Sequence, residues 1–393
     1  MKRIALFSIT YHPFIGGAEI AIKEVTDRLG SEKFSARGGP AFGWDLFTAR
    51  LNVRLSREER IGNVNVFRVG SGRPLLDKLL YPWRASRLAL RMHDKKPYDL
   101  VHAVLETYAG LAALLFKRKR PLVPYVLTLQ SGDPDEFIRK KTWFWSRWYR
   151  QVYTRADRVT AISLWLAARA KRYGFRGSVE IIPNGVDIAH FGGEMRNDER
   201  EFVRRSWGAG EKDFLAITAS RLVRKNGIDI LIASLAYLPQ GVKLVIAGGG
   251  EDEAALRAQS KSFPGRVVFL GEMGHKDLPR VLKACDAFAR PSRSEGLGNS
   301  FLEAMAAGIP VVGTPVGGIV DFLKDGETGL LAQAENPKSV AEKINQLATD
   351  KGLCKTLARN AQALAVSRYD WEGIAAQYGR IYQQSLQPNV PQA

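Results

Sequence analysis

The sequence predicts an α/β protein with two domains, each built on a parallel sheet that helices cover on both faces. With 393 residues, the chain is too long for a single hydrophobic core. Short apolar runs bounded by Gly or Pro alternate with helix-length segments, which is the pattern of strands buried on both faces. These runs form two sets, at 3–10, 98–104, 124–130 and 157–163, and at 241–250, 265–271, 285–292 and 308–315.

The stretch between the two sets marks the domain boundary. Residues 179–191 read VEIIPNGVDIAHF, in which Pro183 and the pair Asn184-Gly185 are typical of a loop. The end of the chain has the spacing of an amphipathic helix, which we expect to cross back to the N-terminal domain. The expected parts are an N-terminal domain, a C-terminal domain and this final helix, over 1–187, 188–367 and 368–393.

One region resists placement. WDLFTAR, at 44–50, predicts a further strand of the N-terminal domain. The segment before it, within 30–43, reads as a loop that fits no expected element.

The composition is that of a folded globular protein, with 45% hydrophobic and 25% charged residues. No stretch approaches the roughly 18 consecutive apolar residues of a membrane span. The only cysteines, Cys285 and Cys354, are too few for a disulfide framework or a zinc cluster. The apolar run near the N-terminus lacks a small-residue cleavage site, so it predicts a buried strand rather than a signal peptide. We therefore expect a cytoplasmic protein.

The net charge of +18 is concentrated in the first half of the chain. Residues 1–187 carry 33 Lys and Arg against 17 Asp and Glu, whereas residues 188–393 carry 25 against 23. This asymmetry favours an anionic partner for the first half, such as a membrane face, an anionic lipid or glycan, or nucleic acid. A solvated basic surface without a partner is the alternative.

Two loops that follow strands carry groups suited to phosphate. In open α/β sheets, ligands bind at the carboxyl ends of the strands. Gly16 and Gly17 precede a helix, where the backbone can approach a ligand and helix N–H groups can bind an anion. Arg221 and Lys225 stand four residues apart, so on one helical or turn surface both would face a diphosphate. A tight turn and an exposed basic face are the alternatives.

A third loop, 248–250, consists of three glycines after a strand. Glu251, Asp252 and Glu253 follow and would repel phosphate, although they complement the start of a helix. We therefore expect this loop to face a nucleotide base or to serve turn geometry alone.

The stretch RPSRSEGLGNSFLEAMAAGIPVV, from Arg290 to Val312, places Glu295 in a glycine-rich loop and Glu303 inside the helix that follows. A carboxylate accepts hydrogen bonds in pairs, so it suits the vicinal hydroxyls of a ribose or hexose. N–H groups at the same helix start can hold a phosphate. The pattern predicts a clamp for a sugar–phosphate–sugar ligand, and the carboxylate pair of a hydrolase is the rival interpretation.

These landmarks together resemble a known family. SEGLGNSFLEAMAAGIPVVGTPVGGIVDFLKDGETGLL is similar to the Glu-x7-Glu region of the family 4 retaining glycosyltransferases. GGAE, IIPNGVD, SRLVRKNGID and DAFARPS resemble the other landmarks of that family, in the same order, over nearly the whole chain. The resemblance implies the GT-B fold, in which two Rossmann-like domains face a cleft. It also implies a donor held by the C-terminal domain and an acceptor held by the N-terminal one.

The resemblance implies roles for single residues. Arg221 and Lys225 hold the donor diphosphate, Glu303 holds the ribose, and Glu295 holds the transferred sugar. Glu295, Arg221 and Lys225 form the expected catalytic set. The nucleotide base of the donor lies near 271–277. The remaining donor contacts are expected from Gly16, Gly17, Gly298, Asn299 and Ser300.

The family also sets an expectation for the chemistry. Its members retain anomeric configuration, need no metal, and use the leaving phosphate as the base for the acceptor hydroxyl. The chain has no metal-binding Asp-x-Asp in a suitable loop, which agrees. We therefore expect a UDP- or GDP-sugar donor and neither a cofactor nor a metal.

This chain departs from the family at one position. Many members have a histidine where Gln130 stands, and glutamine can orient a sugar hydroxyl but cannot share a proton. Gln130, Asp133 and His102 are the candidates for orienting the acceptor or sugar. A histidine satisfied within the core is the alternative for His102.

Two stretches of the first half combine cations with large apolar groups, at 75–96 and 137–158. Such stretches lie in membrane interfaces, stack on glycans or bind nucleic acid. No recognised nucleic-acid module accompanies them, so we expect no nucleic-acid partner and favour an anionic membrane surface. The alternative is an aromatic stripe that faces the core with a solvated basic back.

The expected function is transfer of a hexose from a nucleotide-sugar to a glycan or lipid-linked acceptor, with retention and without metal. A synthase of small-molecule glycosides is the alternative within enzymes. A catalytically silent scaffold or basic binding module of the same fold is the alternative from another class.

Overall fold

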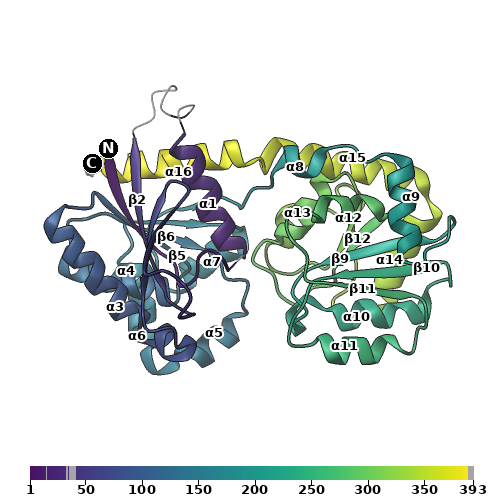
Figure 1. The fold of residues 1–393 in the computed structure, drawn as a ribbon, viewed down its shortest axis with the longest axis horizontal. Helices are drawn as coiled ribbons and strands as arrows, with labels where there is room; N and C mark the ends of the chain where they lie inside the picture. The colour runs from purple at the N-terminus through teal and green to yellow at the C-terminus, as the bar shows by residue number, and fades with distance from the viewer. Residues whose placement is uncertain (15, 32–33, 35–40, 388–393) are drawn as a thin grey trace. The chain divides into compact units, whose positions relative to one another are not determined.

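The computed structural model describes residues 1–14, 16–31, 34 and 41–387, which form two compact units (Figure 1). Met1–Asn184 and Trp371–Ala393 make the first unit, and Gly185–Asp370 makes the second. The chain thus leaves the first unit three residues before the expected boundary at 187 and re-enters it at Trp371 rather than at 368. The expected final helix is Trp371–Leu386, which lies in the first unit as predicted, and a separate helix, Lys351–Arg368, ends the second unit before it.

The first unit is an eight-stranded sheet in the order β3-β4-β2-β1-β5-β6-β7-β8. All neighbours are parallel except β3 and β4, which form an antiparallel hairpin at the edge. Its strands are β1 Lys2–Phe7, β2 Phe42–Ala49, β3 Glu58–Ile61, β4 Val64–Val69, β5 Leu100–Val104, β6 Tyr125–Leu129, β7 Arg158–Ala161 and β8 Val179–Ile181. Its helices are α1 Gly17–Leu29, α3 Pro74–Lys95, α4 Tyr108–Lys119, α5 Asp135–Thr142, η1 Trp143–Trp145, α6 Ser146–Thr154, α7 Leu164–Arg172 and α16 Trp371–Leu386.

Helices α1 and α16 lie side by side on one face of this sheet (Figure 1). The apolar side of α16, with Ile374, Tyr378 and Ile381, is buried with Ile22 and Val25 of α1 in one core cluster. This 3–4 residue spacing is the helical period that the terminal sequence showed. The terminal helix is therefore part of the core of the first unit.

The hairpin β3–β4 was not predicted, because β3 is short and polar and the apolar run of β4 is interrupted by Asn65 and Arg68. The connecting Gly62-Asn63, with Gly62 at φ +57°, is the two-residue turn that could have indicated it. The predicted strand at 44–50 is confirmed as β2. Residues 35–40 of the loop before it lie outside the described part of the chain.

The second unit is a six-stranded parallel sheet in the order β11-β10-β9-β12-β13-β14. Its strands are β9 Phe214–Ala219, β10 Val242–Ala247, β11 Val267–Gly271, β12 Ala287–Ala289, β13 Val311–Gly313 and β14 Leu330–Leu331. Its helices are α8 Ile188–Gly192, α9 Asn197–Ser206, η2 Arg224–Asn226, α10 Ile228–Ala233, η3 Ser234–Tyr237, α11 Glu253–Ser260, α12 Leu278–Ala284, α13 Asn299–Ala306, η4 Gly317–Asp321, α14 Pro337–Thr349 and α15 Lys351–Arg368. The strand order reverses between β9 and β12, which makes their carboxyl ends the place where such a sheet binds ligands.

Candidate functional site

The loops after β9 and β12 meet at this reversal point. The backbone N–H of Arg293 donates to the carbonyl of Lys225 over 2.7 Å. Gly227 adopts φ +69°, and a Cβ there would stand 1.9 Å from the carbonyl oxygen of Pro291. The close approach therefore requires glycine, and it ties the loop that carries Lys225 to the loop that carries Glu295.

Arg221 and Lys225 do not share a helical surface. Arg221 is exposed in the loop directly after β9, and only Lys225 lies in the short helix η2. Of the helical or turn surface expected for this pair, the structure thus has the turn, because the chain bends between the two residues. The side-chain amide of Asn226 donates to the carbonyl of Arg221 over 2.7 Å, so both cations belong to one fixed turn.

Arg290 organises the loop of Glu295, and sequence reasoning missed it. It directly follows β12, and its buried guanidinium donates to Glu295 Oε2 at 2.6 Å, Ser300 Oγ at 2.7 Å and Ser292 Oγ at 3.2 Å. Burial lowers the pKa of Arg290, and the nearby carboxylates of Glu295 and Glu303 oppose that shift. A cation directly after a strand was the available signal, although its partners could not be read from spacing.

Glu295 is consequently held in one orientation. Its second oxygen accepts from the backbone N–H of Gly296 over 3.1 Å, while the first is held by Arg290. The side chain is 18% exposed, so part of the carboxylate remains open to a ligand. A carboxylate oxygen accepts more than one hydrogen bond, so both oxygens can still receive sugar hydroxyls.

Helix α13 begins beside this pair. Gly298 is its N-cap at φ +104°, and Asn299 and Ser300 are its first residues. The positive end of the helix dipole thus lies next to the Arg290–Glu295 pair, and both favour a group that carries negative charge and hydroxyls.

Glu303 lies one turn further along α13. Its side chain is 14% exposed, and burial raises its pKa to about 7, with Arg290 opposing. His275 Nε2 stands 3.8 Å from Glu303 Oε1. The His275 ring stacks on His190 at 5.1 Å, and His190 Nε2 bonds the backbone oxygen of His275 at 2.9 Å. Neither histidine was a predicted site residue, although His275 belongs to the 271–277 loop.

Close backbone contacts explain the glycines of the loop at 248–250. A Cβ on Gly248 would lie 2.0 Å from the carbonyl oxygen of Ser220, and one on Gly250 would lie 2.3 Å from that of Leu222. The loop thus packs directly on the turn of Arg221. Of the following acids, Asp252 stands at the N-cap position of α11 without a capping side-chain hydrogen bond, and Glu253 in the first turn pairs with Arg257. These contacts support the turn-geometry alternative.

Two family models cover most of the chain. Residues 15–190 match the model described as Glycosyltransferase Family 4, and residues 199–364 match the model described as Glycosyl transferases group 1. The chain is a glycosyltransferase of the family 4 type.

Individual relatives agree with this assignment. This glycosyltransferase is 24% identical over 380 residues to an uncharacterized glycosyltransferase of Methanocaldococcus jannaschii, which covers 95% of this chain and 96% of the relative. It is 31% identical over 242 residues, 58% of this chain and 62% of the relative, to the GDP-mannose-dependent alpha-(1-6)-phosphatidylinositol monomannoside mannosyltransferase of Mycobacterium tuberculosis.

A solved structure shows the same fold. The Anabaena protein HepE, in complex with UDP and glucose, matches with a TM-score of 0.78 at 23% identity, over 98% of this chain and 100% of that one. At that identity the likeness shows the GT-B fold alone. No helix in the described part of the glycosyltransferase has the length and apolar character to cross a bilayer.

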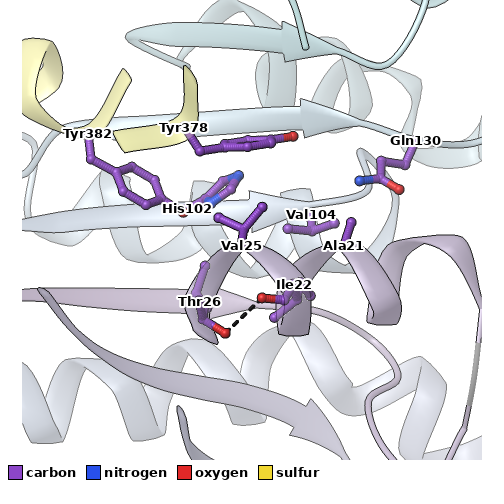
Figure 2. A pocket seen from close by; sticks show the side chains of 10 residues that line it. Ala21, Ile22, Val25, Thr26, His102, Val104, Gln130, Tyr378 and Tyr382 are labelled. Carbon is purple, nitrogen blue, oxygen red and sulfur yellow. Dashed lines mark hydrogen bonds between the residues drawn. The ribbon is translucent and has the colours of Figure 1, made fainter. Parts of the chain in front are cut away.

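In the first unit of the glycosyltransferase, His102 lies in the core. Its Nδ1 bonds the hydroxyl of Tyr382 at 2.9 Å and its Nε2 bonds that of Thr128 at 2.7 Å. Burial lowers the pKa of His102 to about 3. His102 and Gln130 line a cavity of about 20 Å³, in which His102 lies beside Tyr378 and Tyr382 (Figure 2). That volume admits a water but no sugar, which favours the core alternative for His102.

The side chain of Arg169 holds the loop after β6, which carries Gln130 and Asp133, through hydrogen bonds. This buried guanidinium donates to the carbonyl of Ser131 at 3.1 Å and to Asp135 Oδ1 at 2.7 Å. It also pairs with Glu106 at 3.1 Å, and both side chains are fully buried. Gln130 itself accepts from the amide of Asn184 at 3.2 Å.

Gly16 and Gly17 stand at the start of α1, with Gly16 as the N-cap and Gly17 exposed. A Cβ on Gly16 would lie 2.7 Å from Glu19 Oε2, so that carboxylate already occupies the helix start, where it also accepts from Thr10. An anion bound here would have to approach a carboxylate. The structure thus favours a tight turn more strongly than the sequence did.

Proposed function

We propose that the second unit binds a UDP- or GDP-hexose and that the enzyme transfers the hexose with retention of configuration and without a metal. The observation that carries this proposal is the Arg290-centred arrangement, in which Glu295 and Glu303 flank the N-terminus of α13 at the reversal point of the sheet. Glu303 would hold the ribose, and Glu295 the hexose.

Arg221 and Lys225 take the place of a metal in this proposal. The bond between the anomeric carbon and the diphosphate oxygen breaks, and the departing diphosphate gains negative charge. Arg221, Lys225 and the amides of Gly298 to Ser300 would stabilise that charge. The acceptor hydroxyl attacks the same face of the sugar and passes its proton to the leaving phosphate.

Relatives support two donor bases. HepE was solved with UDP and glucose, and the mycobacterial relative is named for GDP-mannose. The name of the latter also supports a lipid-linked acceptor, which we assign to the first unit, with Gln130 and Asp133 orienting hydroxyls.

Slow hydrolysis of the donor tests the mechanism without knowledge of the acceptor. The enzyme is incubated with each UDP- and GDP-hexose in EDTA, and the released hexose is followed by proton NMR before it mutarotates. We expect the anomer of the donor to appear first and EDTA to have no effect. The opposite anomer, or a rate abolished by EDTA and restored by Mg²⁺, would contradict retention or metal independence.

We also propose that residues 75–96 and 137–158 contact an anionic membrane surface. Trp143 and Phe144 are 75% and 73% exposed, so these two rings face solvent, whereas Tyr149 and Tyr153 of the same stretch face the core. Neutralising Arg139, Lys140 and Lys141 together should abolish sedimentation with phosphatidylglycerol vesicles, and unchanged sedimentation would sink this part of the proposal.

A catalytically silent scaffold of the same fold would release no hexose from any donor. Arg290, Glu295 and Ser300 form a connected polar network inside the second unit, which a protein without a ligand there has no physical need to maintain.

A further inference from the structure

The two basic, aromatic stretches of the first unit line one pocket. Helix α3 supplies Leu79 and Trp83, α4 supplies Leu115, and the segment after α5 supplies Trp145 and Trp148. The cavity has a volume of about 360 Å³, within the roughly 300–1,000 Å³ of small-molecule sites. Stretches that lie about 60 residues apart in the chain thus build one apolar cavity, which none of the expected site residues lines.

The mouth of this pocket is apolar and exposed. Trp83 and Phe144, which both line the pocket, are 56% and 73% exposed, and the ring of Trp143, 75% exposed, contacts that of Phe144. A water-soluble ligand gives no reason to keep such rings in solvent, whereas a bilayer interface does.

Cations surround the same mouth. Lys141 lines the pocket, and its ammonium lies 5.6 Å from the ring of Tyr108. The guanidinium of Arg118 lies 4.0 Å from the ring of Trp148. Lys141 forms no ion pair with any residue in the described part of the chain. The charge at the mouth is therefore open to an anionic group.

We propose that this pocket holds one acyl chain of an anionic glycerophospholipid, with the phosphate at Lys141. The proposal rests on the proposed function, because it takes the acceptor to be lipid-linked rather than a free glycan. The first unit then extracts the acyl chain of that lipid from the leaflet. The apolar walls match the chain, the cationic mouth matches the phosphate, and the exposed rings match the interface from which the lipid comes.

Quenching of tryptophan fluorescence tests the pocket directly. The probe is a lysophosphatidylglycerol with a brominated acyl chain, used below its micellar concentration, because bromine quenches only rings that it contacts. We expect saturable quenching of the full chain, and weaker binding of the zwitterionic lysophosphatidylcholine of the same chain.

Matched variants separate the cavity from the surface. Leu115→Glu places a carboxylate in the pocket, whereas Leu122→Glu makes the same change at a 95% exposed leucine outside it. We expect at least tenfold weaker binding for the first and none of this loss for the second. Lys141→Glu should weaken binding of the anionic probe only, and Lys355→Glu on the second unit should not. The unfolding temperatures of all four variants verify that they fold. Leu115→Phe is the milder substitution to use if Leu115→Glu does not fold.

Three results would overturn the proposal: no quenching of the unmodified protein, equal binding by Leu115→Glu and Leu122→Glu, or equal affinity for the two headgroups. Stabilisation by a nucleotide-sugar is measured on the same preparations. Stabilisation without quenching refutes the pocket alone, and quenching without stabilisation by any donor refutes the proposed function alone.

Discussion

Single residues of the second unit define its chemistry through burial. Arg290 is surrounded by protein, so its three hydrogen bonds fix Glu295 and the first turn of α13 as one piece. Burial also disfavours the charged form of the Glu303 carboxyl group, which is why its pKa lies near 7. The two carboxylates are thus unequal: Glu295 is held by the guanidinium of Arg290, whereas Glu303 is balanced between two protonation states near pH 7.

The balance at Glu303 predicts a pH dependence of donor affinity. Its folded pKa, about 7, lies above the ordinary 4.5, so Glu303 is mostly protonated at pH 6 and ionised at pH 8. An ionised carboxylate accepts from both ribose hydroxyls, so affinity should rise by up to about tenfold from pH 6 to pH 8. Calorimetry with an intact nucleotide-sugar, whose diphosphate does not titrate there, measures it. Glu303→Gln should bind weakly and without this rise, and a rise that persists in Glu303→Gln would assign the titration elsewhere.

The same pKa predicts a stability effect of opposite sign without donor. A raised folded pKa means that Glu303 favours the folded state in acid, and this contribution is lost as pH rises from 4.5 to 7. The unmodified protein should therefore lose stability relative to Glu303→Gln between pH 5 and pH 8, as thermal unfolding of the two proteins would show. A stability difference that stays constant with pH would contradict the raised pKa.

In the first unit, Arg169 supports the loop of Gln130 at the cost of burying an ion pair. Arg169→Met should destabilise the protein by about 3–5 kcal/mol, because Glu106 remains as a buried, unpaired carboxyl. Arg172→Met is the matched control, since Arg172 binds the same Asp135 but is 48% exposed, and it should cost no more than about 1 kcal/mol. Denaturant unfolding measures both. Equal effects would refute the role of burial, and Glu106→Gln added to Arg169→Met should restore part of the stability.

At the scale of elements, the candidate site arises because the sheet reverses its strand order between β9 and β12. The loops after these strands meet although about 70 residues separate them, and glycines set how closely they approach. Lys225, Pro291 and Arg293 are held together by backbone contacts, so the positions of the site residues depend on loop packing more than on side-chain choice.

A pair of glycines tests this dependence. Gly227 and Gly208 have nearly the same φ, +69° and +72°, but a Cβ on Gly227 would meet Pro291 whereas one on Gly208 would meet nothing within 4 Å. Gly208→Ala should cost about 1–2 kcal/mol from backbone strain alone. Gly227→Ala should cost more and should also weaken donor binding, because it forces the two loops apart. Equal stability losses with unchanged donor binding would show that the contact does not position the site.

The elements also show how much of the structure could be predicted from the sequence. Most of the buried strands were predictable because they lie in short apolar runs, and β2 was predicted from WDLFTAR, whereas β8 and β14, three and two residues long, were not predicted. The hairpin β3–β4 was missed because β3 is short, polar and exposed and the apolar run of β4 is interrupted by Asn65 and Arg68. Arg290 and His275 were missed for another reason: their importance comes from contacts with Glu295 and Glu303, which depend on which loops meet in space and leave no period or spacing in the chain.

At the scale of the whole molecule, the division of labour follows the charge. The first unit carries most of the excess of Lys and Arg and contains the apolar pocket with its cationic mouth, and the second unit is nearly neutral and contains the clamp. This distribution of charge fits our proposal that the first unit meets an anionic acceptor while the second holds the nucleotide-sugar.

The most direct test of the central claim is thermal unfolding of the full chain with a panel of UDP- and GDP-sugars in EDTA. Binding to the native state adds about 2.7 kcal/mol of stability at a hundredfold excess over the dissociation constant, so a true donor is detectable. The account predicts stabilisation by one donor class, lost in Glu303→Ala and Arg221→Ala and kept in the exposed controls Glu342→Ala and Arg359→Ala. Stabilisation that survives in Glu303→Ala and Arg221→Ala, or none with any nucleotide-sugar, would contradict the account.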